Sequence, residues 1–452
     1  MVSGRYLVLT ERDLESLDPL RLDREIARAA LGLRKQLRRE GAGDLDAADP
    51  FLRSRLVAGR SAFRAVRELP ESDPMRAPLA AWVYRLADHR INAGARARVE
   101  VEWRLVKHVA AEPERVETTL SELLVRALSD EKRREALVRS YFRIGGDVAS
   151  AVTLLWQRRQ EVASRLGLTG PDAITAPCAG MTDVAGAWLE RTNAAFEEIR
   201  RPSLPGLLAV ALAEGATEGW PRNLVPRTVL EPFRATDLFR SVDLDPGELP
   251  ALVGPTSFLR AYARVGAAWV DAMAPKDQPF VVAHDPFGLR RRTFGSLLAL
   301  LGGTRAFGRH ALGLSGPRLS EHLRQLSAAL LVASRLAALR VLLRGAALGG
   351  RELFQETFER ETHRALGIAL SPRSAGSLIR LHEDDDQRFA GALLAGGDAA
   401  RLRDERDEDW FRDPRTTERL RDEARLSPER TTTKDALERG SAALYQALTD
   451  AL

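Results

Sequence analysis

The sequence of 452 residues contains a single cysteine. One cysteine cannot form an intrachain disulfide, and this excludes the disulfide-stapled scaffolds of small secreted proteins. We therefore expect a reducing compartment and a cytoplasmic protein. Aromatic residues are also few, at 6%, whereas hydrophobic residues reach 44% and charged residues 29%. This composition is typical of a soluble globular chain rather than of a disordered one.

Long uninterrupted hydrophobic runs are also lacking. A membrane-spanning helix needs about 20 apolar residues, and the most apolar stretch, residues 326–348, contains Arg335, Arg340 and Arg344. The first residues reach Glu11 without the apolar segment of a signal peptide. The sequence therefore predicts a buried amphipathic helix in this stretch and no contact with a membrane.

Neither sign of charge dominates the chain. It has 68 Lys and Arg residues, very few of them lysine, against 63 Asp and Glu residues, for a formal net charge of +5. The two signs are interleaved, whereas a dedicated nucleic-acid binder concentrates its positive charge on one face or tail. We therefore expect no nucleic-acid partner. The basic triplet Arg290, Arg291 and Arg292 fits either an anion-binding site or an ordinary surface patch, so binding of a nucleic acid or another anionic surface stays an alternative.

Helical periodicity runs through almost the whole chain and predicts a mainly α fold. Residues 22–39 place their apolar side chains on one stripe, and Thr119 with Glu122 predicts the start of a further helix. Gly145 and Gly146 predict a break. We therefore expect an N-terminal helical lobe over residues 1–146 and a helical body over residues 147–452. Residues 279–283 form the best strand candidate.

No His-Glu-x-x-His zinc motif is present. The nearest substitute is Glu356, Glu359 and His363, spaced three and four residues apart on one predicted helix. This face could bind a metal or could be a solvated face with a local ion pair. His382 precedes four acidic residues, which fit either an acidic helix start or a metal site. A hydrolase with a metal site relocated to these residues is therefore an alternative.

Two segments carry a resemblance to a known family. Residues 154–168, Leu-Leu-Trp-Gln-Arg-Arg-Gln-Glu-Val-Ala-Ser-Arg-Leu-Gly-Leu, are similar to a helix of the thimet oligopeptidase and oligoendopeptidase F family of zinc peptidases. Residues 407–414, Asp-Glu-Asp-Trp-Phe-Arg-Asp-Pro, resemble a tryptophan-containing turn of the same family. The resemblance covers residues 150–452. It implies a two-lobed, gluzincin-like helical fold with a small β-sheet beside the active-site helix.

The segment that would carry catalysis departs from the family pattern. The family reads Leu-Leu-His-Glu-Leu-Gly-His where residues 297–303 read Leu-Leu-Ala-Leu-Leu-Gly-Gly. By this resemblance Ala299 and Gly303 stand at the zinc-binding histidines and Leu300 at the general base, and the third ligand falls near Glu321. Catalytic zinc needs three protein ligands, and one carboxylate cannot replace them. The resemblance therefore implies that zinc and any other cofactor are absent.

These observations lead to one main hypothesis. We expect a catalytically inactive member of a metallopeptidase-like fold, a pseudoenzyme, that binds a peptide or a partner protein in the cleft between its lobes. The relocated hydrolase and the anionic-surface binder are the alternatives.

Overall fold

The structure, a computed structural model, shows a mainly helical chain with 73% of its residues in helices. This confirms the expected helical class. It describes residues 18–41, 50–51, 54–110, 114–213, 220, 225–239, 242–247, 249, 253–348, 351–379, 384–426 and 428–452.

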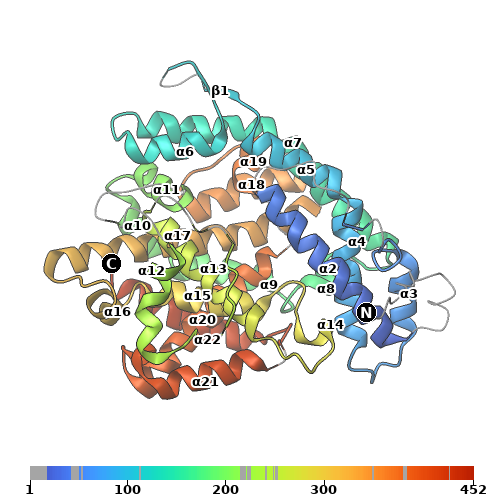
Figure 1. Cartoon of the computed structure of the whole chain (residues 1–452). Helices are drawn as coiled ribbons and strands as arrows, with labels where there is room; N and C mark the ends of the chain where they lie inside the picture. The colour runs from blue at the N-terminus through green and yellow to red at the C-terminus, as the bar shows by residue number, and fades with distance from the viewer. Residues whose placement is uncertain are drawn as a thin grey trace.

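The elements follow one another as shown in Figure 1. The first part of the chain comprises α2 (Pro19–Gly41), α3 (Arg60–Glu68), α4 (Arg76–Ile91), α5 (Ala93–Arg104), β1 (His108–Ala110), β2 (Val116–Thr118), α6 (Leu120–Ser129) and α7 (Arg134–Arg165). The middle comprises α8 (Asp172–Thr175), α9 (Met181–Arg191), α10 (Asn193–Arg200), α11 (Leu204–Leu212), α12 (Pro226–Leu230), η1 (Glu231–Thr236), α13 (Pro255–Met273) and α14 (Phe280–Ala283). The remainder comprises α15 (Leu289–Leu301), α16 (Arg305–His310), α17 (Gly316–Leu348), α18 (Arg351–Leu366), η2 (Pro372–Ser374), α19 (Ala375–Leu378), α20 (Asp385–Arg406), η3 (Trp410–Arg412), α21 (Pro414–Arg425) and α22 (Lys434–Thr449).

Two of the predicted helix starts are confirmed. The stripe of residues 22–39 lies in α2, whose Leu22 and Ile26 are fully buried. The Thr119 side chain accepts a hydrogen bond from the Glu122 amide, and the Glu122 carboxylate accepts one from the Thr119 amide. This reciprocal capping box satisfies amides that a helix start would otherwise leave unpaired.

The predicted break at Gly145 and Gly146 is wrong, because α7 runs without interruption through both residues. Their physical role is close packing rather than chain reversal. A Cβ at Gly145 would overlap the Ser377 hydroxyl of α19, and one at Gly146 would lie 3.0 Å from the Arg373 carbonyl oxygen. The boundary expected at residue 146 therefore falls inside a single helix.

The predicted strand at residues 279–283 is also wrong, because the segment forms the helical turn α14. The turn is capped from a distant part of the chain: Asp23 of α2 accepts hydrogen bonds from the Phe280 and Val281 amides, at 3.1 and 2.8 Å. The antiparallel pair β1–β2 lies elsewhere, packed against α7 at the far end of the molecule from α15 (Figure 1). The small sheet of the described chain is therefore not beside the helix of residues 297–303.

Two hydrophobic clusters form the interior. The smaller cluster joins α2, α3 and α4 to the C-terminal end of α7 and to α14, with Phe63, Tyr84 and Val162 among its buried members. The larger cluster extends from α5 to α22. Because α7 contributes to both clusters, the two cores share one helix and neither of them ends at residue 146.

Helices α13, α15, α20 and α22 pack side by side in the lower half of Figure 1. Glycines allow their backbones to approach closely. A Cβ at Gly266 of α13 would lie 2.7 Å from the Phe294 carbonyl oxygen of α15, and a Cβ at Gly391 of α20 would lie 2.7 Å from the Arg292 Cβ. This packing fixes α15, the helix of the degenerate zinc motif, between two neighbours.

One helix in the described part of the chain, over Gly316–Arg344 of α17, is long and apolar enough to cross a membrane by length and composition. Its most apolar window is 72% buried inside the protein. A core helix of a globular protein passes the same test.

Candidate functional site

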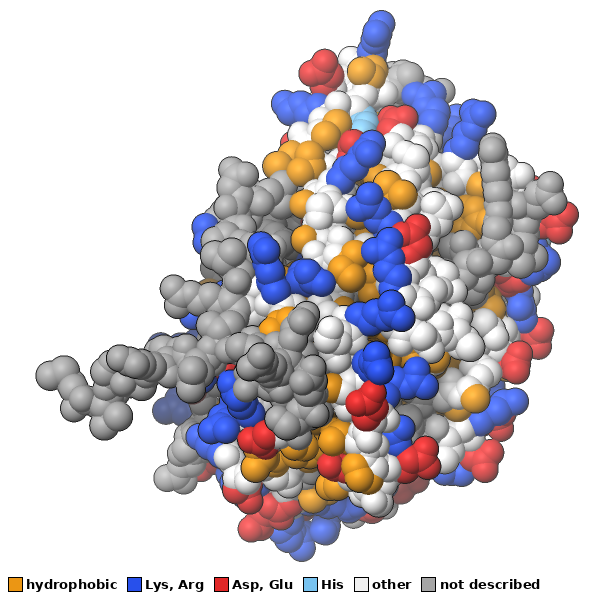
Figure 2. All heavy atoms as spheres, turned by 90° about the vertical axis from the view of Figure 1, so that its right-hand side faces the viewer, with side chains coloured by type: hydrophobic (Ala, Val, Ile, Leu, Met, Phe, Trp, Pro, Cys, Tyr) orange, Lys and Arg blue, Asp and Glu red, His pale blue; other side chains and the backbone are white. Residues whose placement is uncertain are grey.

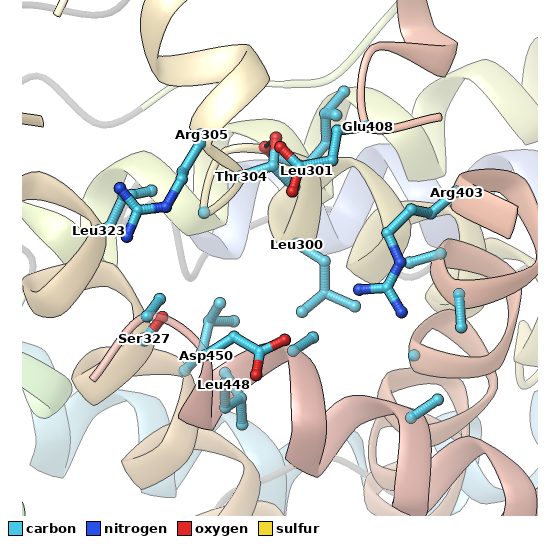
Figure 3. Close-up of a pocket in the computed structure, with 18 of the residues that line it drawn as sticks. Leu300, Leu301, Thr304, Arg305, Leu323, Ser327, Arg403, Glu408, Leu448 and Asp450 are labelled. Carbon is cyan, nitrogen blue, oxygen red and sulfur yellow. Dashed lines mark hydrogen bonds between the residues drawn. The ribbon is translucent and has the colours of Figure 1, made fainter. Parts of the chain in front are cut away.

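A pocket lies at the C-terminal end of α15, where α15, α17, α20 and α22 meet (Figure 3). Its volume is about 120 Å³, slightly less than a cavity known to hold one benzene ring. This space fits one apolar side chain. The apolar part of the lining consists of Leu300, Leu301, Leu323, Leu330, Trp410, Leu448 and the small residues Gly303, Gly396, Ala399, Ala400, Ala443, Ala447 and Ala451.

Charged side chains of both signs stand at the mouth of the pocket. Arg403 comes from the last turn of α20, Arg305 from the first turn of α16, Glu408 from the turn before η3, and Asp450 from the end of α22. All four are exposed. Figure 3 shows the Arg403 guanidinium and the Asp450 carboxylate pointing into the space beside Leu300. The pocket thus combines an apolar floor with a dipolar rim.

The polar groups that line the pocket are charged side chains and hydroxyls. No histidine or cysteine lines it, and its hydroxyls are those of Thr304 and Ser327. The Thr304 hydroxyl is already engaged, since it accepts a hydrogen bond from the Phe307 amide and caps α16. Ser327 shares the lining with the Glu408 and Asp450 carboxylates. A serine nucleophile needs an adjacent base to take its proton, and the described part of the chain shows no hydrogen bond between the Ser327 hydroxyl and either carboxylate.

The degenerate zinc frame contributes three residues to this pocket, and two of them, Leu300 and Gly303, stand at positions of the family's catalytic or zinc-binding residues. Leu300 and Gly303 line it, whereas Ala299 is buried in the helix packing. Glu321 of α17 is not a lining residue; its carboxylate accepts hydrogen bonds from Arg324 at 2.7 and 2.9 Å and from Gln325 at 2.7 Å. The Arg324 guanidinium holds the pKa of Glu321 below its usual range. Glu321 is therefore engaged on the surface of its own helix.

The proposed alternative metal face is not assembled in the described part of the chain. Glu356, Glu359 and His363 are all exposed on α18. No group of three or more His, Cys, Asp or Glu side chains there has the arrangement of a metal site. His382 lies outside the described residues.

The three arginines of the basic triplet are engaged within the fold. Arg290 donates a hydrogen bond to the Leu426 carbonyl oxygen, and Arg291 lies 3.5 Å from an Asp271 carboxylate oxygen. Arg292 donates from Nε to Asp384 at 3.0 Å. Each of the three guanidiniums is half-buried and has an acceptor within the fold, and anion binding by the triplet stays a prediction.

Arg292 belongs to an ionic cluster that was not expected from the sequence and that combines buried groups with the half-buried Arg292 and with Asp172, whose side chain is 49% exposed. We define the ionic cluster as Arg292, Arg344, Asp172, Asp384 and Asp386. Arg344 of α17 pairs with Asp386 of α20 and, at 2.8 Å, with Asp172 of α8. The sequence contained a signal of this cluster. Arg340 and Arg344 lie in the most apolar stretch of the chain, and residues 383–386 form an acidic run. Charged side chains in an apolar core need partners of opposite charge, and the acidic run could supply them.

Burial dominates the electrostatics of this cluster. Asp386 is fully buried and Arg344 is 4% exposed. Removal from water disfavours the ionised carboxylate and raises the pKa of Asp386 to about 6, although Arg344 opposes the shift. Burial likewise raises the pKa of Asp385. The cluster joins α8, α15, α17 and α20.

One face of the molecule carries a row of Lys and Arg side chains, with acidic side chains beside it (Figure 2). On α7, Arg139 pairs with Glu135 at 2.9 Å and Arg165 with Glu161 at 3.6 Å. Such pairs offset part of the positive charge that an anionic partner would meet.

Known proteins add no assignment to this geometry. No protein-family model matches the chain, and no curated protein matches it. The resemblance to the thimet oligopeptidase and oligoendopeptidase F family, and the two-lobed gluzincin-like form that it implies, therefore stay predictions.

Proposed function

We propose that this protein is a non-catalytic peptide-binding protein, which takes an apolar side chain of its ligand into the pocket at the end of α15. The observation that carries the proposal is the composition of the pocket: a leucine-rich floor, charges of both signs at the mouth, and no imidazole or thiol in the lining. Apolar concave sites with a few oriented polar groups are the usual form of ligand sites.

The residues of the degenerate zinc frame support the same proposal. Under the resemblance, Leu300 replaces a general base and Gly303 replaces a zinc ligand. Both residues line the pocket, whereas Ala299, at the other zinc-binding position, does not, so the pocket borders the frame with an isobutyl side chain and a glycine. A surface of this kind favours an apolar group over a cation or an activated water.

The place of binding differs from the expected cleft between two lobes. All the lining residues fall between residues 300 and 451, within the helices that pack around α15. The proposal therefore rests on this pocket and not on an arrangement of lobes.

A pocket-filling variant tests the proposal. Ala447 lines the pocket and is half-buried, whereas Ala442 on the same helix is exposed and does not line it. A random heptapeptide library selected on the wild-type protein should enrich sequences with a leucine, methionine or phenylalanine at one position. Ala447→Trp should abolish binding of the selected peptide, and the matched control Ala442→Trp should retain it.

Two readouts accompany the binding measurement. Mass spectrometry after prolonged incubation should recover the selected peptide uncleaved. Elemental analysis of the purified protein should find less than one zinc per ten chains. Cleavage of the peptide, one equivalent of zinc, or binding that Ala447→Trp leaves unchanged would each contradict the proposal.

A further inference from the structure

The rim of the pocket carries no net charge but a separated pair of opposite charges. Arg305 and Arg403 stand against Glu408 and Asp450. A ligand with one charge would meet repulsion as well as attraction at such a rim, whereas a ligand with both charges can place each one beside its opposite. The rim therefore favours a dipolar ligand.

The two charged side chains that point into the pocket do not pair with each other. Between Arg403 and Asp450, both of which lie in the described part of the chain, the structure contains no ion pair. Arg403 instead pairs with its sequence neighbour Asp404, with 3.8 Å between Arg403 Nε and Asp404 Oδ1. The Arg403 side chain is 44% exposed and that of Asp404 is 74% exposed. Asp450 accepts a hydrogen bond from Gln446 Nε2 at 2.5 Å through one oxygen, Oδ1. An exposed and distant pair such as Arg403–Asp404 contributes little free energy, so Arg403 can turn to a ligand at small cost.

The size of the pocket also limits the ligand. A volume of about 120 Å³ accommodates one leucine-sized group beside Leu300 and Leu448, and not a longer chain. The α-amino acid unit carries an ammonium and a carboxylate on the carbon that bears its side chain, so it presents all three groups within the span of one residue.

We infer that the pocket recognises a free apolar α-amino acid, with its side chain on the leucine floor, its carboxylate at Arg403 and its ammonium at Asp450. Glu408 supplies a second acceptor for the ammonium at the rim (Figure 3). This inference rests on the proposed function, since it specifies the ligand of the same pocket. Each end of a peptide carries only one of these two charges, so a peptide would then bind less tightly than the free amino acid.

Three ligands that differ in one group each test the inference by isothermal titration calorimetry on the wild-type protein. They are L-leucine, L-leucinamide, which lacks the carboxylate, and N-acetyl-L-leucine, which lacks the ammonium. L-leucine should bind, and each derivative should bind at least about tenfold more weakly, because each leaves one charge-assisted hydrogen bond to the rim unmade.

Two variants assign the contacts. Arg403→Gln should weaken L-leucine about tenfold and leave L-leucinamide unchanged, and Asp450→Asn should weaken L-leucine and leave N-acetyl-L-leucine unchanged, because a contact that is already missing cannot be removed again. Arg406→Gln, also in the last turn of α20 but outside the pocket lining, should have no effect on any of the three ligands.

The outcomes separate this inference from the proposed function. If an acetylated and amidated heptapeptide binds in a manner sensitive to Ala447→Trp while L-leucine does not bind, the inference is overturned and the peptide-binding proposal stands. Equal affinities of L-leucine and its two derivatives would also overturn the inference. If neither L-leucine nor any selected peptide binds, both proposals are wrong.

Discussion

The two ends of α15 use the same charged residue types for opposite purposes. At its N-terminal end, Arg292 is held by Asp384, inside a cluster whose Asp386 is fully buried. At its C-terminal end, Arg403 and Asp450 are exposed around an apolar pocket. Charges that are removed from water must be paired, and their partners lock helices together. Charges at an exposed rim keep their freedom, and a ligand can recruit them.

The contrast between the two ends of α15 predicts the largest loss of stability for a substitution at Arg344, which pairs with two carboxylates of the ionic cluster. Arg344→Ala leaves Asp386 buried without its partner and also removes the partner of Asp172. We expect the free energy of unfolding to fall by about 3–5 kcal/mol, measured by urea denaturation at pH 7. The control Arg425→Ala removes an exposed arginine and should change stability by less than about 0.5 kcal/mol. A small loss for Arg344→Ala would show that the cluster does not hold the helices together.

A second prediction concerns the pH dependence of stability. The pKa of Asp386 is raised to about 6 from an ordinary value of 3.8, so the folded protein binds a proton that the unfolded chain has released. Binding of this proton stabilises the folded state. The stabilisation is complete below about pH 3.8 and is lost as the pH rises through about 6, so the free energy of unfolding falls by about 2–3 kcal/mol. Denaturation curves between pH 4 and 8 measure it.

Asp386→Asn serves as the control for this titration, because the amide cannot ionise. The variant should become more stable relative to the wild-type protein as the pH rises from 4 to 8. A difference that does not change with pH would contradict the raised pKa.

A third prediction concerns the backbone contact beneath the ionic cluster. Gly391→Ala places a methyl group 2.7 Å from Arg292 Cβ and 2.9 Å from the Thr293 amide nitrogen, so α20 and α15 must separate. Overpacking of this kind costs about 1–3 kcal/mol. On the same helix a Cβ at Gly397 would meet nothing closer than 3.5 Å. Gly397→Ala should therefore be neutral or stabilising, and equal losses for the two variants would contradict the close approach at Gly391.

The smallest stability effect is expected at the rim. Arg403→Gln and Asp450→Asn should each change the free energy of unfolding by less than about 0.5 kcal/mol, because both side chains are exposed. Differential scanning calorimetry measures this. A loss comparable to that of Arg344→Ala would remove the contrast between the two ends of α15 and would assign the rim a structural role.

The helical class could be predicted from sequence because its signals are local. The apolar stripe of α2 and the pairing of Thr119 with Glu122 each lie within a few residues of one another. The errors arose where a distant residue decides the outcome. Asp23 caps α14 from more than 250 positions away, and Ser377 explains Gly145, which is read locally as a break.

The candidate site was predictable only in part. Leu300 and Gly303 were singled out as positions that had lost the general base and a zinc-binding histidine, respectively, and both line the pocket. Arg403, Glu408 and Asp450 come from separate elements that only the tertiary fold brings together, and no spacing in the sequence connects them. The ionic cluster was missed for the same reason, since Asp172, Arg344 and Asp386 meet from three different helices.

The most direct measurement of the central claim is a crystal structure of the protein soaked with the selected heptapeptide, in which selenomethionine occupies the apolar position. Selenium scatters anomalously, so its position in the crystal can be observed without assumption about the pose. The account predicts one selenium peak inside the pocket, in contact with Leu300 and Leu448. A peak elsewhere on the molecule, or a metal ion bound beside Gly303, would contradict it.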